Sequence, residues 1–236
     1  MQRPESIENR WDILYRDYPE VYEAFSNTPY HPTVYERLRE IMDLRGKRIA
    51  DVGAGTGQSS LALARDAQTV IAIEYESAMM RIAREKALAA AADSAARRVI
   101  YLSGDALNLP LADNAVDMVT AITLALYPPE QYRVFIREAL RVARGPVVYL
   151  GIPPGWYGGD LYDVIEDVEK VDDSVDRIFL EEFQFAYQDI FTDQEYGTLA
   201  HIVSTYGFIF GKKAIEYLKR EKKTSIRWKF RVYWRE

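Results

Sequence analysis

Residues 48–65 read RIADVGAGTGQSSLALAR, and this stretch decides the fold. An apolar run, a cluster of glycines and a helix-forming run follow one another without a break, which predicts a strand, a tight loop and a helix. Gly53, Gly55 and Gly57 leave the backbone free to adopt positive φ and let a ligand approach closely. The helix that follows would point its first free N–H groups at that ligand.

The glycine spacing separates this loop from a dinucleotide-binding loop. A G-x-G-x-x-G frame that starts at Gly53 ends on Gln58, and one that starts at Gly55 ends on Ser60. Neither frame closes on a glycine. A nicotinamide-dependent oxidoreductase is therefore disfavoured.

The same stretch resembles the D-x-G-x-G-x-G motif of the class I S-adenosylmethionine-dependent methyltransferases. In that family the motif binds the amino acid end of the cofactor. The resemblance implies S-adenosylmethionine as the cofactor. It assigns cofactor contacts to Asp51, Gly53, Ala54, Gly55 and Gly57.

Alternating strand and helix patterns continue through the chain. Continuous apolar runs suit parallel strands that are buried on both faces, and strict alternation with helices requires a parallel sheet. We expect a Rossmann-like three-layer α/β sandwich whose mostly parallel seven-stranded sheet ends in an antiparallel hairpin. The expected strands are residues 49–52, 69–74, 98–102, 116–122 and 145–152, and the expected helices are 58–66, 77–92 and 129–142.

Glu74 ends the second expected strand, 21 positions after Gly53. An acid at about this interval meets the ribose hydroxyls in mononucleotide-binding βαβ units, because an ionised carboxylate can accept from two neighbouring hydroxyls. A helix cap or a solvated acid is the alternative. By resemblance, Tyr75 would lie near the adenine.

A second specific match covers residues 103–120, SGDALNLPLADNAVDMVT. This segment resembles G-D-A-x-x-L-P-F-x-D-x-x-F-D in small-molecule methyltransferases related to the C-methylating enzymes of quinone biosynthesis. In that family the carboxylate of the triplet and the next backbone N–H bind the adenine, which assigns these roles to Asp105 and Ala106. Asp117 is expected to be structural.

The fourth expected strand runs into Thr123, which we assign to the cofactor site, and then into Tyr127. The related enzymes often carry A-L-H here. Tyr127 stands in the place of the histidine, so a histidine-dependent proton transfer at this position is in doubt. Tyr127 and His31 are the candidates for a general base, which is needed only if the acceptor loses a proton.

Residues 5–44 show aromatic side chains at helical spacing, interrupted near Tyr30 and His31. Such a stripe is typical of packing, although in many class I methyltransferases a helical N-terminal extension helps to form the substrate pocket. Residues 153–191 begin with a glycine- and proline-rich turn and then become acidic. We expect a lid whose Trp156 and Tyr157 contact the acceptor, or else a solvated insertion.

The chain divides into a helical cap at 1–45, a cofactor-binding core at 46–152, an acidic lid at 153–191 and a final unit at 192–236, all within one domain. In the final unit, Thr192–Glu195 has the form of a capping box and predicts a helix start. The alternation at 226–234 predicts a strand. Residues 214–218 would be its hairpin partner.

Composition excludes several classes of site. The 236 residues include no cysteine and two histidines, so disulfides and thiolate sites are excluded and no metal is expected. No signal peptide or membrane-spanning run is evident, and we expect a cytoplasmic protein. Residues 160–195 carry a net charge of −11 and residues 212–236 one of +7. They neutralise each other, or they form a lid for a cationic substrate and a tail for an anionic partner.

These patterns predict an enzyme that transfers the methyl group of S-adenosylmethionine to a small organic acceptor by in-line displacement, as a monomer or homodimer. The acidic pI of about 5.2 disfavours nucleic acid. Two alternatives stay open. One is a non-catalytic cofactor-binding scaffold or regulatory protein. The other is an RNA methyltransferase that uses the basic stripe Arg227, Lys229, Arg231 and Arg235.

Overall fold

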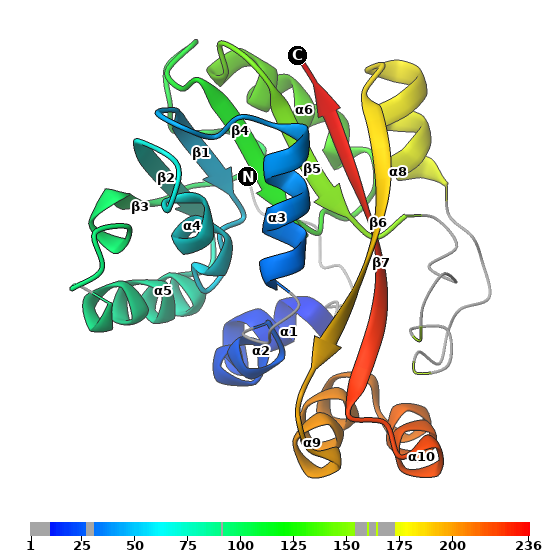
Figure 1. Ribbon diagram of the computed structural model, residues 1–236. Helices are drawn as coiled ribbons and strands as arrows, with labels where there is room; N and C mark the ends of the chain where they lie inside the picture. Colours follow the sequence, from blue (N-terminus) through cyan, green and yellow to red (C-terminus); the bar gives the residue numbers. More distant parts are fainter. Residues whose placement is uncertain (1–9, 27–30, 91, 154–159, 161–163, 165–172) are drawn as a thin grey trace.

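A twisted sheet forms the centre of the computed structural model, which describes residues 10–26, 31–90, 92–153, 160, 164 and 173–236. Seven strands of this part follow the order β3-β2-β1-β4-β5-β7-β6 (Figure 1). The first five are parallel, and β7 lies antiparallel between β5 and β6. The predicted fold class is confirmed. The strands are β1 Arg48–Val52, β2 Thr69–Glu74, β3 Val99–Ser103, β4 Met118–Ile122, β5 Val147–Gly151, β6 Ala186–Glu195 and β7 Ser225–Arg235.

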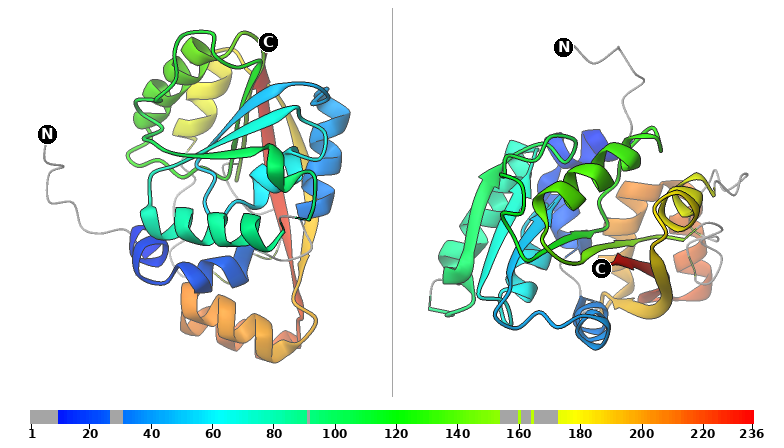
Figure 2. Two further views of the ribbon diagram at one scale, coloured as in Figure 1. Left: turned by 90° about the vertical axis from the view of Figure 1, so that its left-hand side faces the viewer. Right: turned by 90° about the horizontal axis from the view of Figure 1, so that it is seen from above.

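Helices cover both faces of the sheet (Figure 2). None of the helices in the described ranges is long and apolar enough to cross a membrane. Helix and turn bounds are α1 Arg10–Asp17, α2 Pro19–Ser26, α3 His31–Ile41, α4 Gln58–Leu63, α5 Ser77–Ala89, η1 Ala96–Arg98, α6 Gln131–Val142, α8 Ser174–Asp176, η2 Arg177–Glu182, α9 Leu199–Phe210 and α10 Lys212–Glu221.

The buried strand β5 shows how the layers form. Its side chains alternate between two apolar cores, since successive residues of a strand point to opposite faces. Val148 and Leu150 join the core with α3 and α4. Val147 and Tyr149 join the core with α6 and η2. All four side chains are buried, which explains the continuous apolar run.

Helices α1 and α2 lie across the end of the sheet at which the parallel strands finish (Figure 1). Two ion pairs fix α2 to α5. Glu20 contacts Arg81 at 2.7 Å, and Glu23 contacts Lys86 at 2.7 Å. The second pair is mostly buried, so it gives the cap a defined position rather than a large net stabilisation.

The expected helix start at Thr192 is wrong. Thr192 and Gln194 are buried residues of β6, which pairs with β7 from Ala186 to Glu195. The real N-cap lies six residues later, where the Thr198 hydroxyl accepts from the backbone N–H of His201 at 3.2 Å. A local capping pattern was overridden by pairing with a strand distant in sequence.

Residues 214–218 were expected to form the hairpin partner of the last strand, and they are instead part of the helix α10. The antiparallel partner is β6. The expected lid at 153–191 is also too long, because residues 186–191 belong to that strand. Phe179 of η2 is fully buried in the core on the α6 face. Residues 154–159, 161–163 and 165–172 of the expected lid lie outside the described part of the chain.

The acidic and basic segments neutralise each other where the structure describes them. Arg231 lies between Asp189, at 2.6 Å, and Asp176, at 2.5 Å. Lys229 contacts Asp189 at 3.0 Å, and Lys223 contacts Asp160. For these pairs, the expectation that the acidic and basic segments neutralise each other is therefore confirmed.

A buried amide fixes the cap to the hairpin. The side chain of Gln194 donates to the backbone carbonyl of Phe25, at the end of α2, and accepts from Tyr206 and from Trp228. Tyr196 donates to the same carbonyl at 3.0 Å. Every partner is buried, so each hydrogen bond replaces one that the group would otherwise make with water.

Replacing this amide should destabilise the protein strongly. In Gln194→Ala the Tyr206 hydroxyl and the Trp228 indole lose a buried acceptor, and we expect a loss of about 2–4 kcal/mol in the free energy of unfolding, measured by urea denaturation. Gln188→Ala, at an exposed position of the same strand, is the control and should change stability by less than about 0.5 kcal/mol. Equal effects of the two variants would contradict the role given to Gln194.

Candidate functional site

The glycine loop follows β1 and is bound to the end of β2. Gly53, Gly55 and Gly57 have φ of 70°, 54° and 82°. The backbone N–H groups of Gly53 and Ala54 donate to the carbonyl of Ile73 at 2.9 and 3.1 Å. These bonds close the loop at the edge where ligands bind in open parallel sheets.

The side chain of Asp51 fixes the start of the loop to α4 and β4. Its Oδ2 accepts from the hydroxyls of Ser59 and Ser60 at 2.6 Å each, and its Oδ1 accepts from Thr120 at 3.0 Å. The side chain is fully buried. Burial raises the pKa of the Asp51 carboxyl, while the three hydroxyl donors oppose this shift. The carboxyl therefore joins β1, β4 and α4.

The carboxylate of Glu74 binds the loop at Gly55. Its Oε2 accepts from the backbone N–H of Gly55 at 2.8 Å, and its Oε1 accepts from that of Glu76 at 2.7 Å. Burial raises the pKa of the Glu74 carboxyl, and the backbone donors act in the opposite direction. Each carboxylate oxygen can accept a second hydrogen bond.

Thr123 directly follows β4 and has φ of 56°. This conformation is rare for a β-branched residue and is held by the surroundings. Its backbone N–H donates to Leu150 at 2.7 Å. The buried hydroxyls of Tyr132 and Tyr149 both donate to the carbonyl of Leu124 at 3.0 Å, which fixes the next residue as well.

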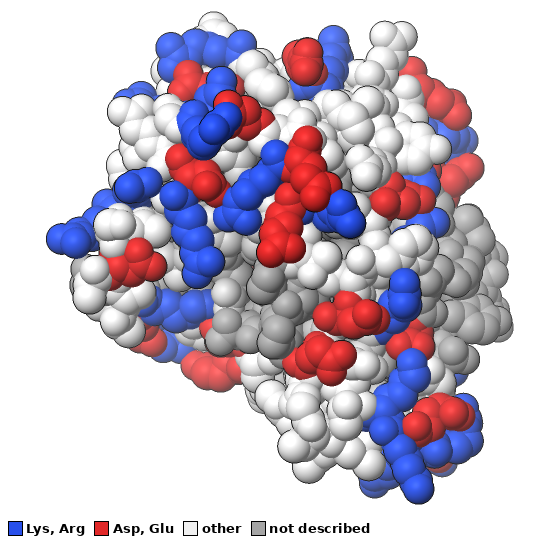
Figure 3. All heavy atoms as spheres, viewed as in Figure 1, with Lys and Arg blue, Asp and Glu red and all other residues white. Residues whose placement is uncertain are grey.

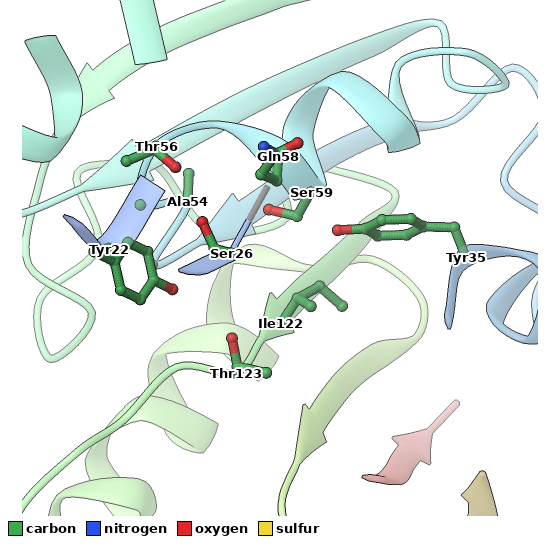
Figure 4. Close-up of a pocket in the computed structure, with 11 residues that line it drawn as sticks. Tyr22, Ser26, Tyr35, Ala54, Thr56, Gln58, Ser59, Ile122 and Thr123 are labelled. Carbon is green, nitrogen blue, oxygen red and sulfur yellow. The ribbon is translucent and has the colours of Figure 1, made fainter. Parts of the chain in front are cut away.

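A cavity opens between the glycine loop, Thr123 and the cap (Figure 4). The described residues of its lining are uncharged, and several carry hydroxyl groups. The lining residues are Tyr22, Ser26, Tyr35, Gly53, Ala54, Gly55, Thr56, Gln58, Ser59, Ile122 and Thr123.

Tyr22 of the cap contributes its side chain to the cavity lining. Its hydroxyl and the side chain of Thr123 face each other across the cavity in Figure 4. Burial, followed by the nearby charge of Glu74, raises the pKa of Tyr22 to about 12. Tyr15 packs edge-on against Tyr22 with ring centroids 5.0 Å apart. At neutral pH Tyr22 is therefore a hydrogen-bonding group and not a base.

The structure brings part of the predicted site together. Gly53, Ala54, Gly55 and Thr123 line the cavity, and Glu74 contacts it through the Gly55 N–H. Gly57 is in the same loop, where its N–H donates to Ala54 at 2.8 Å.

The other predicted cofactor residues lie around this centre. Asp105 and Ala106 follow β3, the strand next to Glu74, and the Asp105 carboxylate accepts from the backbone N–H of Leu107 at 2.9 Å. Tyr75 is 56% exposed. Asp51 has no exposed surface and faces α4 rather than the cavity. The cofactor contacts of these residues stay predictions.

The candidates for acid–base chemistry and acceptor binding are placed less fully. Tyr127 is 76% exposed and is not among the cavity residues. His31 begins α3, but its side chain lies outside the described part of the structure. Tyr30, Trp156 and Tyr157 also lie outside the described residues.

A family model described as "Methyltransferase domain" matches residues 49–145. These residues run from Ile49 of β1 to just beyond the end of α6, and they include β2 to β4 and the whole glycine loop. Residues 49–145 are thus similar to a methyltransferase domain. The match confirms the resemblance seen in the sequence, and S-adenosylmethionine is the cofactor that it implies.

A known methyltransferase is similar to part of this chain. A demethylmenaquinone methyltransferase of Clavibacter sepedonicus is 35% identical over 106 residues, which are 45% of this chain and 40% of that protein. The aligned part thus spans about two fifths of the relative's length.

Solved structures show how widely the fold is used. The magnesium protoporphyrin IX methyltransferase of Synechocystis, with bound S-adenosylhomocysteine, has a TM-score of 0.56 and 16% identity, and covers 95% of this chain and 91% of that chain. A [4+2]-cyclase has a TM-score of 0.55 and 20% identity, with 86% and 79% covered. Because one neighbour is a cyclase, the fold alone does not decide the reaction.

The sequence pattern missed several cavity residues of the matched region and of the cap. Thr56, Gln58 and Ser59 adjoin the glycine loop, and their position next to it was the available signal. Tyr22 and Ser26 belong to the aromatic stripe that was interpreted as packing. No local signal shows which face of such a helix meets a strand end more than 25 residues later.

Gly53 tests the geometry of the glycine loop. A Cβ at Gly53 would lie 2.7 Å from Leu124 Cδ1, whereas one at Gly46, with nearly the same φ of 69°, meets nothing within 4 Å. We expect Gly53→Ala and Gly46→Ala each to cost about 1–2 kcal/mol of unfolding free energy through the left-handed backbone. Only Gly53→Ala should also weaken S-adenosylhomocysteine binding in calorimetry. Equal affinities in both variants would contradict this.

Proposed function

We propose that this protein transfers the methyl group of S-adenosylmethionine to a small organic acceptor. One observation carries the proposal. The cavity opens at the carboxyl ends of β1 and β4, between the glycine loop and Thr123. Strand order reverses at this point, since β2 and β3 lie on one side and β4 and β5 on the other. Open α/β sheets bind their ligands at such a switch point.

The residues present fit the cofactor. The Thr56 hydroxyl lines the cavity, is buried, and has no hydrogen-bond partner among the described residues. A buried polar atom without a partner is costly, and a bound polar ligand would remove that cost. The glycine loop and Thr56 would hold the amino acid end, Glu74 the ribose hydroxyls, and Asp105 with Ala106 the adenine. When bound, S-adenosylmethionine supplies an activated electrophilic methyl group.

The chain's own task is alignment and exclusion of water. The described cavity lining has no carboxylate and no imidazole. It can orient an acceptor by hydrogen bonds and cover it with the cap. Alignment of this kind can lower a barrier by roughly 7–11 kcal/mol. We therefore favour an acceptor whose nucleophilic atom needs no strong base from these residues.

Two alternatives are weaker. The basic stripe proposed for RNA is largely engaged within the molecule. Arg231 and Lys229 contact Asp189, Arg227 lies over the ring of Phe191, and Arg235 donates to Phe183. A non-catalytic cofactor-binding protein would bind the cofactor without forming S-adenosylhomocysteine. A cytoplasmic location stays a prediction.

Glu74 gives a direct test of the cofactor site. Glu74→Gln replaces one acceptor oxygen by an amide, so we expect S-adenosylhomocysteine to bind at least about tenfold more weakly in calorimetry. Glu76→Gln, the same change two residues further on, should bind within about twofold of the unchanged protein. An unaltered affinity in Glu74→Gln would remove the ribose assignment.

Tyr22 tests the participation of the cap. Tyr22→Phe keeps the ring but removes the hydroxyl that faces Thr123 across the cavity, so we expect cofactor affinity to fall by about three- to tenfold. Tyr18→Phe, on an exposed tyrosine of the same segment, is the control. If both variants bind equally well, Tyr22 covers the cavity only by packing.

The reaction itself is tested by product formation. The protein is incubated with S-adenosylmethionine and a panel of small phenols, quinols, amines and carboxylic acids, and S-adenosylhomocysteine is measured by mass spectrometry. We expect release that depends on one acceptor class and is lost in Glu74→Gln. Tight cofactor binding with no release from any acceptor would support the scaffold alternative instead.

A further inference from the structure

The helices α9 and α10 form a lobe at the end of the molecule that also carries the cap (Figure 1). They connect β6 to β7 and lie outside the matched methyltransferase domain. Helix α9 pairs with α10 so closely that a Cβ at Gly207 would lie 2.6 Å from Ile215 Cγ1. The two helices of the lobe are therefore closely packed against each other.

Helix α9 has an uncharged outer surface. Its sequence, LAHIVSTYGFIF, contains no Lys, Arg, Asp or Glu. Phe208 is 53% exposed, and its ring packs edge-on against the exposed Tyr18 of the cap, with centroids 5.1 Å apart. In Figure 3 the lower end of the molecule shows a white area without charged side chains. Two exposed aromatic rings in an uncharged area are typical of an interaction surface.

The neighbouring helix α10 and the two lysines that follow it form a basic segment. Residues 212–223 contain six Lys and Arg against two Glu, a net charge of +4 in a chain whose total is −6. Figure 3 shows this blue group directly beside the uncharged area. Lys212, Lys219, Arg220 and Lys222 are exposed.

We propose that the α9–α10 lobe binds the surface of an anionic lipid bilayer. Aromatic side chains enter the headgroup region, and adjacent Lys and Arg contact the lipid phosphates, as in interfacial helices. An RNA partner fits less well, because phosphates need cations along the contact and α9 offers none. This inference does not depend on the proposed reaction.

The lobe lies beside the cap that covers the cofactor cavity. The cap residue Tyr18 touches Phe208, while Tyr22, four residues later, lines the cavity. A bilayer bound by the lobe would therefore lie next to the cap that covers the cofactor cavity. An apolar acceptor dissolved in the bilayer would then have a short path to the site.

Co-sedimentation of the full chain with vesicles tests the proposal. We expect binding to phosphatidylglycerol/phosphatidylcholine vesicles, little binding to pure phosphatidylcholine, and release as salt rises, since exposed charges are screened. The triple variant Lys212→Glu, Lys219→Glu, Arg220→Glu should bind at least about tenfold more weakly. Phe208→Ser should bind a few-fold more weakly.

A matched control is available at the opposite end of the sheet. Arg45, Arg65 and Arg97 are exposed and precede β1, β2 and β3. Changing these three to Glu alters the net charge equally and should leave most of the vesicle binding intact. Cofactor binding, measured in parallel, should be unchanged in both triple variants, which separates this proposal from the proposed function.

Three results would overturn the lipid proposal. The first is no binding to anionic vesicles, and the second is equal loss in both triple variants. The third is binding of single-stranded RNA, or dimer formation, that is lost in the lobe variants while the unchanged protein ignores vesicles. That third result would assign the same surface to a nucleic acid or to a second copy of the chain.

Discussion

The buried carboxyl of Asp51 is the constraint on which the site depends. It accepts three hydroxyl hydrogen bonds, from Ser59 and Ser60 at the start of α4 and from Thr120 on β4. These bonds join the three elements that meet where the strand order reverses. A buried acid is costly unless its partners are complete, so the glycine loop, α4 and β4 have one relative arrangement. The cavity is the space that this arrangement leaves at the strand ends.

The rest of the molecule closes that space from outside. The cap places Tyr22 over the glycine loop. Two contacts fix the position of the cap. Glu23 pairs with Lys86 of α5, and the Gln194 amide of β6 donates to the Phe25 carbonyl. The β6–β7 hairpin thus connects the cofactor side of the sheet to the α9–α10 lobe. Elements that lie outside the matched region therefore help to build the site.

The sequence was sufficient to predict the parallel strands of the sheet and the glycine loop. Continuous apolar runs, alternate glycines and Glu74 are local signals, and each has a direct physical meaning. It was insufficient for the C-terminal part, because Thr192–Glu195 looks like a capping box while its true partner, β7, begins about thirty residues later. It also could not show that Asp51 accepts from Thr120 of β4, or that Tyr22 faces Thr123. Both facts depend on contacts between distant segments, which periodicity does not encode.

A crystal structure of the complex with S-adenosylhomocysteine is the most direct test of the central claim. The account predicts that the amino acid end lies on the Gly53–Gly55 loop beside Thr56, that the ribose hydroxyls bond to Glu74, and that Tyr22 covers the ligand. Asp51 should keep its three hydroxyl partners. A ligand bound elsewhere, or a ribose that points away from Glu74 toward solvent, would contradict it.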